Sequence, residues 1–484
     1  MMIRPPALLF FLSLIISGCS GGIDNSRLRA DVIEDMPGGF ALGQLPMRPA
    51  SAYLRAATAQ GLVAFDAQGQ VIPALASRWI VTDDGLSYIF RLEKIQWNDG
   101  RPVTSKQVAD SLNIRIRELR NSALGRELTA VDRSVSMTGK IIEIRLKSPM
   151  PNLLELLAQP EFGLIDKGAG SGPMLAQKSG SAMQLRLKGF DESGDPVLSS
   201  ERVILKPNLA AAALVRFKAG QTDVISGGRF HHLPLLSAAN ISGGLVQSDP
   251  VPGLFGLLFA ETGPFLSLQS HREAIAMAID RPRLLTSFDN FAWQESLTLM
   301  PETLQNRANI PPPRWSALPV TQRQELARGV VSQWEAANGN IRPLRISVPD
   351  NAGGRILFAR IRADLAAIGL DAQRALPQRD ADLRLLDIVA DISSPSWYLG
   401  QLSCDVTPVC DKAADGLVRQ ARQTSDPAER QRLLGEAELM LQETRNFIPL
   451  ANPLRWSLTR DGLLGYAPNP RGLHLLQYLG RNPS

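Results

Sequence analysis

Cys19 lies where a bacterial lipoprotein would be cleaved and acylated. Residues 14–18 form a short apolar stretch that ends in small residues, and the apolar run 7–16 follows the basic Arg4. This run is too short to span a bilayer, which requires about 20 apolar residues. The pattern predicts a signal peptide at residues 1–18 and a lipid on the Cys19 thiol that anchors the mature chain to a membrane.

Cys404 and Cys410 are the second candidates for covalent chemistry. The chain has three cysteines, and with Cys19 assigned to the lipid these two remain as a close pair in an oxidising compartment. We expect a disulfide between them, which would stabilise a local turn by about 2 kcal/mol because the closed loop is short. A metal or redox dithiol fits less well, since the two-residue spacing and flanking histidines of such sites are missing.

The histidines and paired acids give little indication of catalysis. His231 and His232 are adjacent, which points side chains apart on most backbones, and Pro234 predicts a loop there. We interpret them as surface or cleft histidines without the partner ligands that a metal or haem would need. The acidic pairs in 83–84 and 380–382 fit turns and strand entries. No P-loop, nucleophile elbow or metal-binding helix pattern accompanies them, so we expect no enzyme, metal or cofactor.

Length, composition and charge predict a large globular protein. At 484 residues with 44% hydrophobic residues, the chain can bury a large core and should divide into two or more lobes. The net charge of +5 is spread over alternating basic and acidic residues without a block of one sign. Together with export from the cytoplasm, this argues against nucleic acid as a partner.

Periodic patterns predict alternating strands and helices that would position these residues. Residues 86–92 and 142–146 alternate between apolar and polar side chains, as half-buried strands do. Between them, Thr104 and Gln107 form a capping box ahead of apolar residues at four-residue spacing, which predicts a helix. Further helices are expected at 271–285, at 355–368, and after Asp426 as cap, with Pro427 in the first position and Glu429 completing a capping box.

Several sequence blocks occur in a specific order along nearly the whole mature chain, from about residue 51 to 460. They resemble the dipeptide- and oligopeptide-binding (family 5) type of extracytoplasmic solute-binding proteins of ABC importers. The matching blocks lie at 60–63, 71–79, 83–92, 97–104, 170–173, 217–224, 272–281 and 447–450.

The resemblance implies an α/β fold, a two-lobed periplasmic-binding-protein-like clamp (type II) with an additional peptide-binder-type lobe. Such a clamp closes around a solute and presents it to a membrane permease. The expected division is a signal peptide at 1–18, a lipid-anchored tether and start of lobe I at 19–50, an extra domain at 51–160, lobe I at 161–250, lobe II at 251–455, and a return to lobe I at 456–484.

The resemblance also implies a function and its partners. We expect a monomeric, lipid-anchored protein, periplasmic or at the cell surface, that captures peptides or related amine-bearing solutes. It would deliver them to an ABC permease and ATPase complex without chemistry.

Asp391 is the ligand residue that the resemblance implies. Peptide-binding relatives place an aspartate after a short apolar strand and shortly before a proline, and its carboxylate holds the ammonium group of the peptide. Residues 386–395 match this pattern. Trp397 and Tyr398 follow and are candidates for lining the pocket. The alternative role for Asp391 is to cap the turn that leads to Pro395.

Departures from the family pattern leave other functions open. Gln60 replaces a glutamate, Met174 an aromatic residue and Ser394 an acidic residue. One alternative is a different solute, such as a metal chelate or haem. Another is a scaffold or regulatory lipoprotein without transport, since Ser20 after the lipidated cysteine resembles lipoproteins that are not held at the inner membrane.

Overall fold

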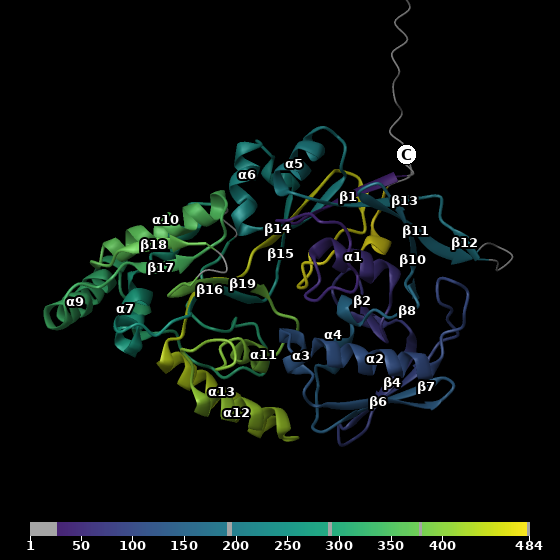
Figure 1. Cartoon of the computed structure of the whole chain (residues 1–484), viewed down its shortest axis with the longest axis horizontal. Helices are drawn as coiled ribbons and strands as arrows, with labels where there is room; N and C mark the ends of the chain where they lie inside the picture. Colours follow the sequence, from purple (N-terminus) through teal and green to yellow (C-terminus); the bar gives the residue numbers. More distant parts are fainter. Residues whose placement is uncertain (1–26, 191–195, 289–292, 377–379, 482–484) are drawn as a thin grey trace, which may run out of the picture.

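Three larger β-sheets, each with its own helices, organise the part of the chain that the structure describes. The computed structural model describes residues 27–190, 196–288, 293–376 and 380–481. Figure 1 shows lobe I across the top, an extra lobe at lower right and lobe II at left, arranged around a central opening between the ribbons. The predicted α/β class is confirmed. Among the described residues, no helix combines the length and apolar character that crossing a membrane requires.

Lobe I is built on a mixed sheet in which parallel strands lie at the centre. In spatial order the strands are β10 (Met174–Ser179), β11 (Ala182–Phe190), β13 (Arg202–Asn208), β1 (Arg27–Ile33), β14 (Val224–Arg229), β21 (Arg455–Thr459) and β15 (Val246–Asp249), with β12 (Pro196–Leu198) on β11. The helices are α1 (Pro49–Thr58), α5 (Ala210–Lys218), η2 (Phe230–His232), α6 (Leu233–Ala238), η3 (Gly243–Leu245) and η6 (Leu476–Tyr478). Helix α1 packs against the sheet beside β1, β10 and β13, and α5 packs against β1 and β14.

The extra lobe is an antiparallel sheet covered by one long helix. Its strands, in order, are β4 (Ala76–Val81), β5 (Ser87–Leu92), β7 (Ile141–Leu146) and β6 (Val131–Thr138). Helix α2 (Ser105–Leu119) packs on β6 and β7 and begins with the predicted Thr104 to Gln107 capping box. Shorter elements follow: α3 (Ala123–Glu127), α4 (Leu153–Leu157) and η1 (Pro160–Phe162), with the small hairpins β2 (Val63–Phe65) with β3 (Val71–Pro73) and β8 (Ile165–Asp166) with β9 (Ala169–Gly170).

Lobe II has a mixed sheet flanked by helices. The strand order is β18 (Ala372–Ala375), β17 (Leu344–Ser347), β19 (Leu383–Val389), β16 (Gly253–Phe259) and β20 (Phe447–Ala451). The helices are η4 (Phe265–Ser267), α7 (Gln269–Ala278), α8 (Arg281–Thr286), η5 (Arg314–Ala317), α9 (Val320–Asn338), α10 (Ala352–Ala366), α11 (Pro395–Gly400), α12 (Lys412–Gln423) and α13 (Pro427–Thr444). The chain enters lobe II between β15 and β16 and returns to lobe I between β20 and β21. A last pair, β22 (Leu463–Leu464) and β23 (Gly480–Arg481), lies near the C-terminus.

Two helix predictions require correction. The helix expected at 271–285 is divided into α7 and α8, because Asp280 adopts a non-helical backbone and its side chain accepts a hydrogen bond from the Arg283 N–H as the cap of α8. In α13, Asp426 is the predicted cap, but Glu429 does not complete a capping box. Its carboxylate instead pairs with Arg432 one turn along the helix.

The extra lobe and lobe II share one hydrophobic core. Buried side chains of α4 and η1, including Leu156 and Phe162, belong to the same cluster as Leu254, Trp397 and Tyr398 of lobe II. Burial of this apolar surface holds the two sides together near α11.

Candidate functional site

Asp391 lies in the loop that joins β19 to α11, at the border between lobe II and the extra lobe. The indole Nε1 of Trp397 donates a hydrogen bond to its Oδ2 over 3.1 Å. No described residue donates a hydrogen bond to Oδ1. Burial raises the pKa of the Asp391 carboxyl above its ordinary value, and the Trp397 hydrogen bond and Arg471 act in the opposite direction.

Segments far apart in the sequence hold the Asp391 loop in place. The carbonyl oxygen of Asp391 accepts hydrogen bonds from Gln159 Nε2 at 2.6 Å and from Arg471 Nη1 at 3.3 Å. Glu155 of α4 accepts the N–H of Ser393 at 3.1 Å and forms an ion pair with Arg471 at 3.0 Å. The loop is therefore fixed from the extra lobe and from the C-terminal segment, which keeps the carboxylate in one orientation.

The structure assigns the cap of the following helix to another residue. Ser394 is the N-cap of α11, and Pro395 takes its first position. The Asp391 side chain bonds to Trp397 instead of capping this turn. Trp397 and Tyr398 are almost completely buried, at 1% and 0% exposure. Trp397 therefore orients the carboxylate, and a direct contact of either ring with a ligand stays a prediction.

Charged groups that the sequence patterns did not single out also surround Asp391. Burial raises the pKa of Glu161, and the nearby Asp391 charge adds to this increase. The cations Arg126 and Arg471 act on Asp391 in the opposite sense. Sequence reasoning missed Glu155, Gln159, Glu161 and Arg471 because they belong to separate segments that meet only in the folded chain.

Cavities lie along the contact between the extra lobe and lobe II. One has a volume of about 70 Å³ and is lined by Glu127, Met150, Ile392, Ser394 and Arg422, among others. A larger one of about 360 Å³ is lined by residues 147–148 of the extra lobe and by α12. Asp391 lines neither cavity, but the residues that follow it line the first.

Glu127 and Arg422 connect the two sides of this contact directly. Arg422 Nη2 of α12 lies 2.6 Å from Oε1 of the buried Glu127 in α3, and Ser396 Oγ donates to Oε2 of Glu127 at 3.2 Å. Ser148 Oγ also donates to the carbonyl oxygen of Arg422 at 2.6 Å. These contacts bind the extra lobe to lobe II.

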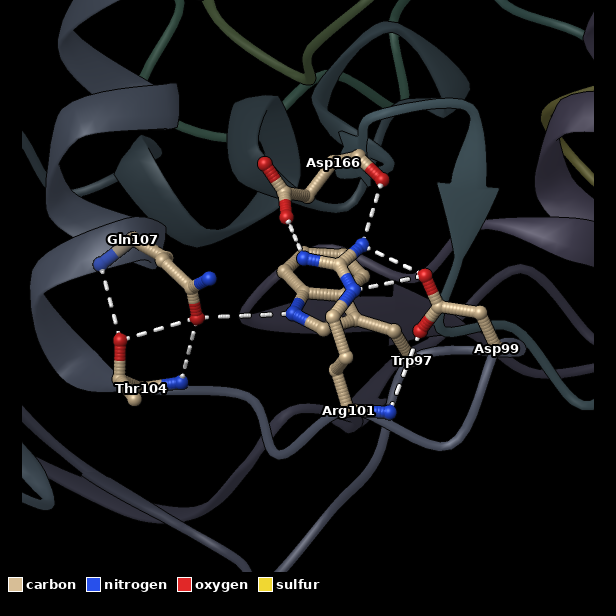
Figure 2. Close-up of polar contacts among 6 residues, drawn as sticks. All are labelled: Trp97, Asp99, Arg101, Thr104, Gln107 and Asp166. Atoms are coloured by element: carbon tan, nitrogen blue, oxygen red, sulfur yellow. Dashed lines mark hydrogen bonds and ion pairs between the residues drawn. The ribbon is translucent and has the colours of Figure 1, made fainter.

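The sequence block at 97–104 has a structural role. Asp99 accepts hydrogen bonds from the backbone N–H and the Nε of Arg101, whose guanidinium also reaches Asp166 (Figure 2). Gln107 Oε1 accepts from Trp97 Nε1 at 3.5 Å and from the Thr104 N–H at 3.1 Å. The block thus ties a turn, the start of α2 and the β8–β9 hairpin together.

The cysteine predictions have different outcomes. Cys404 and Cys410 form a disulfide, with their Cα atoms 5.1 Å apart, as expected. The bond closes the loop between α11 and α12. Cys19 and the predicted signal peptide lie outside the described residues.

We expected His231 and His232 to lie in a loop with their side chains pointing apart, and this prediction was wrong. Both side chains are buried, and both rings turn toward Asp35 because the short helix η2 replaces the expected loop. The Nε2 atom of each ring lies 3.4 Å from Oδ1 of Asp35.

Comparison with solved structures shows the fold. The chain superimposes on Haemophilus influenzae OppA in complex with the peptide RPPGFSPFR with a TM-score of 0.77, at 14% identity, covering 95% of this chain and 99% of that one. The Escherichia coli murein tripeptide binding protein MppA matches with a TM-score of 0.76 at 18% identity, covering 94% and 98%. The predicted clamp is confirmed as a periplasmic-binding-protein fold that carries the extra lobe.

Sequence comparison agrees over most of the chain. A dipeptide-binding protein of Pseudomonas aeruginosa is 23% identical over 476 residues, covering 84% of this chain and 86% of that protein. Residues 70–405 match the model of the bacterial extracellular solute-binding proteins, family 5. These are extracytoplasmic binding proteins and not enzymes. The chain therefore belongs to family 5 of the bacterial extracellular solute-binding proteins.

Proposed function

We propose that this protein is the peptide-binding component of an ABC importer and that Asp391 binds the free amino terminus of the peptide. The observation that carries the proposal is a partly buried carboxylate with one oxygen held by Trp397 and the other free of hydrogen bonds from the described residues. The peptide named with the OppA structure and the name of the Pseudomonas relative support a peptide as solute.

The surroundings of Asp391 suit an ammonium ligand. A charge-assisted hydrogen bond in a poorly hydrated cleft is stronger than a surface pair, because little water screens it. Arrival of an ammonium group would return the raised pKa of Asp391 toward lower values and keep the carboxylate ionised. The fixed backbone of the Asp391 loop reduces the entropy lost on binding.

The location of the protein is part of the same proposal. The apolar run 7–16, the small residues before Cys19 and the family's extracytoplasmic role support export and a lipid anchor at Cys19. We expect Cys19→Ala to release the protein from the membrane fraction. Mass spectrometry of the mature N-terminus would detect the lipid, and an unmodified Cys19 on a membrane-bound protein would contradict the anchor.

Binding measurements with free and N-acetylated dipeptides test the ligand role. We expect wild-type protein to bind only the free amine, and Asp391→Asn to weaken binding by about 10-fold to 100-fold, because a hydrogen bond to a charged group contributes about 1.5–3 kcal/mol. Asp461→Asn removes the same charge at an exposed position and serves as the control.

The melting temperature of the empty protein should remain nearly the same in Asp391→Asn. Equal affinity of Asp391→Asn and Asp461→Asn for free dipeptides, or equal affinity of wild type for acetylated ones, would refute the assignment of Asp391.

A further inference from the structure

Asp35, His231 and His232 converge at one edge of the lobe I sheet. Strands β1 and β14 run parallel, with Val32 opposite Ser226, so their carboxyl ends lie side by side. Asp35 follows the end of β1 by two residues, and His231 follows the end of β14 by two. Side chains that follow the carboxyl ends of adjacent parallel strands are brought together by this topology, and ligands often bind there.

The distances within this cluster are compatible with metal ligands as well as with long hydrogen bonds. Each histidine Nε2 is 3.4 Å from the same Asp35 oxygen, and the three ligand atoms all lie within 4.8 Å of one another. Hydrogen bonds from nitrogen to oxygen are usually about 2.7–3.2 Å long. Ligand atoms bound at about 2.0–2.1 Å at the corners of a tetrahedron lie about 3.3 Å apart.

We propose that Asp35, His231 and His232 form a binding site for a divalent transition-metal ion of the Zn²⁺ class. Two imidazoles and one carboxylate suit Zn²⁺, Cu²⁺ or Ni²⁺ and suit Mg²⁺ or Ca²⁺ poorly, because the latter prefer oxygen ligands. Three protein ligands leave a fourth tetrahedral position for water or another small ligand. The proposal does not depend on the identity of the transported solute.

Hydrogen bonds at the opposite nitrogens decide how easily each ring binds a metal. Within the described residues, Nδ1 of His231 has no partner, so no donor at this atom opposes the tautomer in which Nε2 presents its lone pair, but the proton on Nδ1 then has no acceptor. Nδ1 of His232 accepts the N–H of Arg229 at 3.2 Å, which favours a proton on Nε2. Metal binding at Nε2 of His232 therefore breaks the hydrogen bond from the Arg229 N–H.

The walls of the site come from both lobes. The rings of Phe230 and His231 lie edge to face with their centroids 5.2 Å apart, and those of Trp456 and His232 do so at 6.5 Å. Gly353 in the first turn of α10, in lobe II, packs so closely on the histidine backbone that an added Cβ would lie 2.3 Å from Cα of His231. The ligands thus belong to lobe I and sit where lobe II touches it, with α6 and α10 close together in Figure 1.

Metal titration of the full chain, purified without a polyhistidine tag and stripped with a chelator, tests the site. We expect calorimetry to show one Zn²⁺ bound per chain and no comparable heat with Mg²⁺. Asp35→Asn and His231→Gln should weaken Zn²⁺ binding on the order of 100-fold or more, since loss even of supporting groups costs 10-fold to 100-fold. Asp461→Asn is the matched control.

Asp35 is largely exposed, with 64% of its side chain accessible, so Asp35→Asn should fold normally. The melting temperature of Asp35→Asn in the presence of chelator checks this. The visible absorption of bound Co²⁺ should be weaker in Asp35→Asn than in wild type. Absence of Zn²⁺ binding by wild type would overturn the proposal. Equal Zn²⁺ affinity of Asp35→Asn and Asp461→Asn would also overturn it.

Discussion

At the scale of single residues, burial and neighbouring side chains determine which carboxylates in this protein carry unusual properties. Asp391 is held by Trp397 at the border of two lobes, and Asp35 is held by two histidines at the edge of a sheet. Glu438 of α13 is a third example. It is 4% exposed, lines a cavity of about 50 Å³ in lobe II, and burial raises its pKa to about 7.

Glu438 should make the stability of the protein depend on pH. Its pKa is higher in the folded state than the ordinary 4.5, so the folded state holds an extra proton between about pH 4.5 and 7. The stability that this proton contributes is complete below pH 4.5 and is lost as the pH rises toward 7. We expect Glu438→Gln to raise the free energy of unfolding at pH 7.5 by up to about 3 kcal/mol and to change little at pH 4.5.

Urea unfolding at both pH values measures this effect. Glu443→Gln, an exposed position on the same helix, is the control and should show no such difference. If Glu438→Gln matches wild type at pH 7.5, the proposed shift is wrong.

At the scale of elements, short-range signals place the helices, and one disulfide fixes a connection. Thr104 Oγ accepts the N–H of Gln107, and Gln107 Oε1 accepts the N–H of Thr104. Helix α2 therefore begins where the capping box predicts. The Cys404–Cys410 bond closes the turn between α11 and α12 close to the Asp391 loop.

Removal of the α2 cap should destabilise the extra lobe. We expect Thr104→Ala to lower the free energy of unfolding by about 1 kcal/mol, because the N–H of the first helical turn loses its acceptor. Thr104→Ser keeps the hydroxyl and should retain most of the stability. Chemical denaturation of both variants checks the prediction, and equal loss in the two would contradict a role for the hydroxyl.

Removal of the disulfide should have a limited effect. The double variant Cys404→Ser with Cys410→Ser is expected to lose about 2 kcal/mol, because only a short loop is freed in the unfolded chain. Reductant should destabilise wild type by a similar amount and leave the variant unchanged. A complete loss of folding in the variant would show that the bond does more than fix a local turn.

At the scale of the whole molecule, the Glu127 to Arg422 ion pair joins α3 of the extra lobe to α12 of lobe II beside the shared core. Clamps of this kind open and close by hinge motions between lobes. We expect this pair to favour the arrangement in which the extra lobe and lobe II are in contact.

Glu127→Gln should shift this equilibrium toward the open form. We expect X-ray scattering of the ligand-free variant to give a larger radius of gyration and solute affinity to fall about 10-fold, which corresponds to about 1.4 kcal/mol. Glu118→Gln removes an acid from the exposed face of α2 in the same lobe and is the control. Unchanged scattering and affinity in Glu127→Gln would exclude a role of the pair in closure.

The sequence by itself determined the family, the α/β class, the α2 cap and the disulfide. Each of these depends on residues that are close together in the sequence or on the order of blocks along the chain. Both kinds of signal are visible in the sequence itself. The break between α7 and α8 was harder to predict, since the apolar periodicity continues across Asp280 while its side chain caps the second helix.

Only the tertiary structure decided how the sites are assembled. Gln159 meets Asp391 across 232 positions of sequence, Glu155 meets Arg471 across 316, and Asp35 meets His231 across 196. Such contacts result from the packing of whole lobes, in which many small burial energies are summed, and no local pattern records them. The sequence could therefore name Asp391 through its family, but it could not show what holds that carboxylate or that two adjacent histidines share one aspartate.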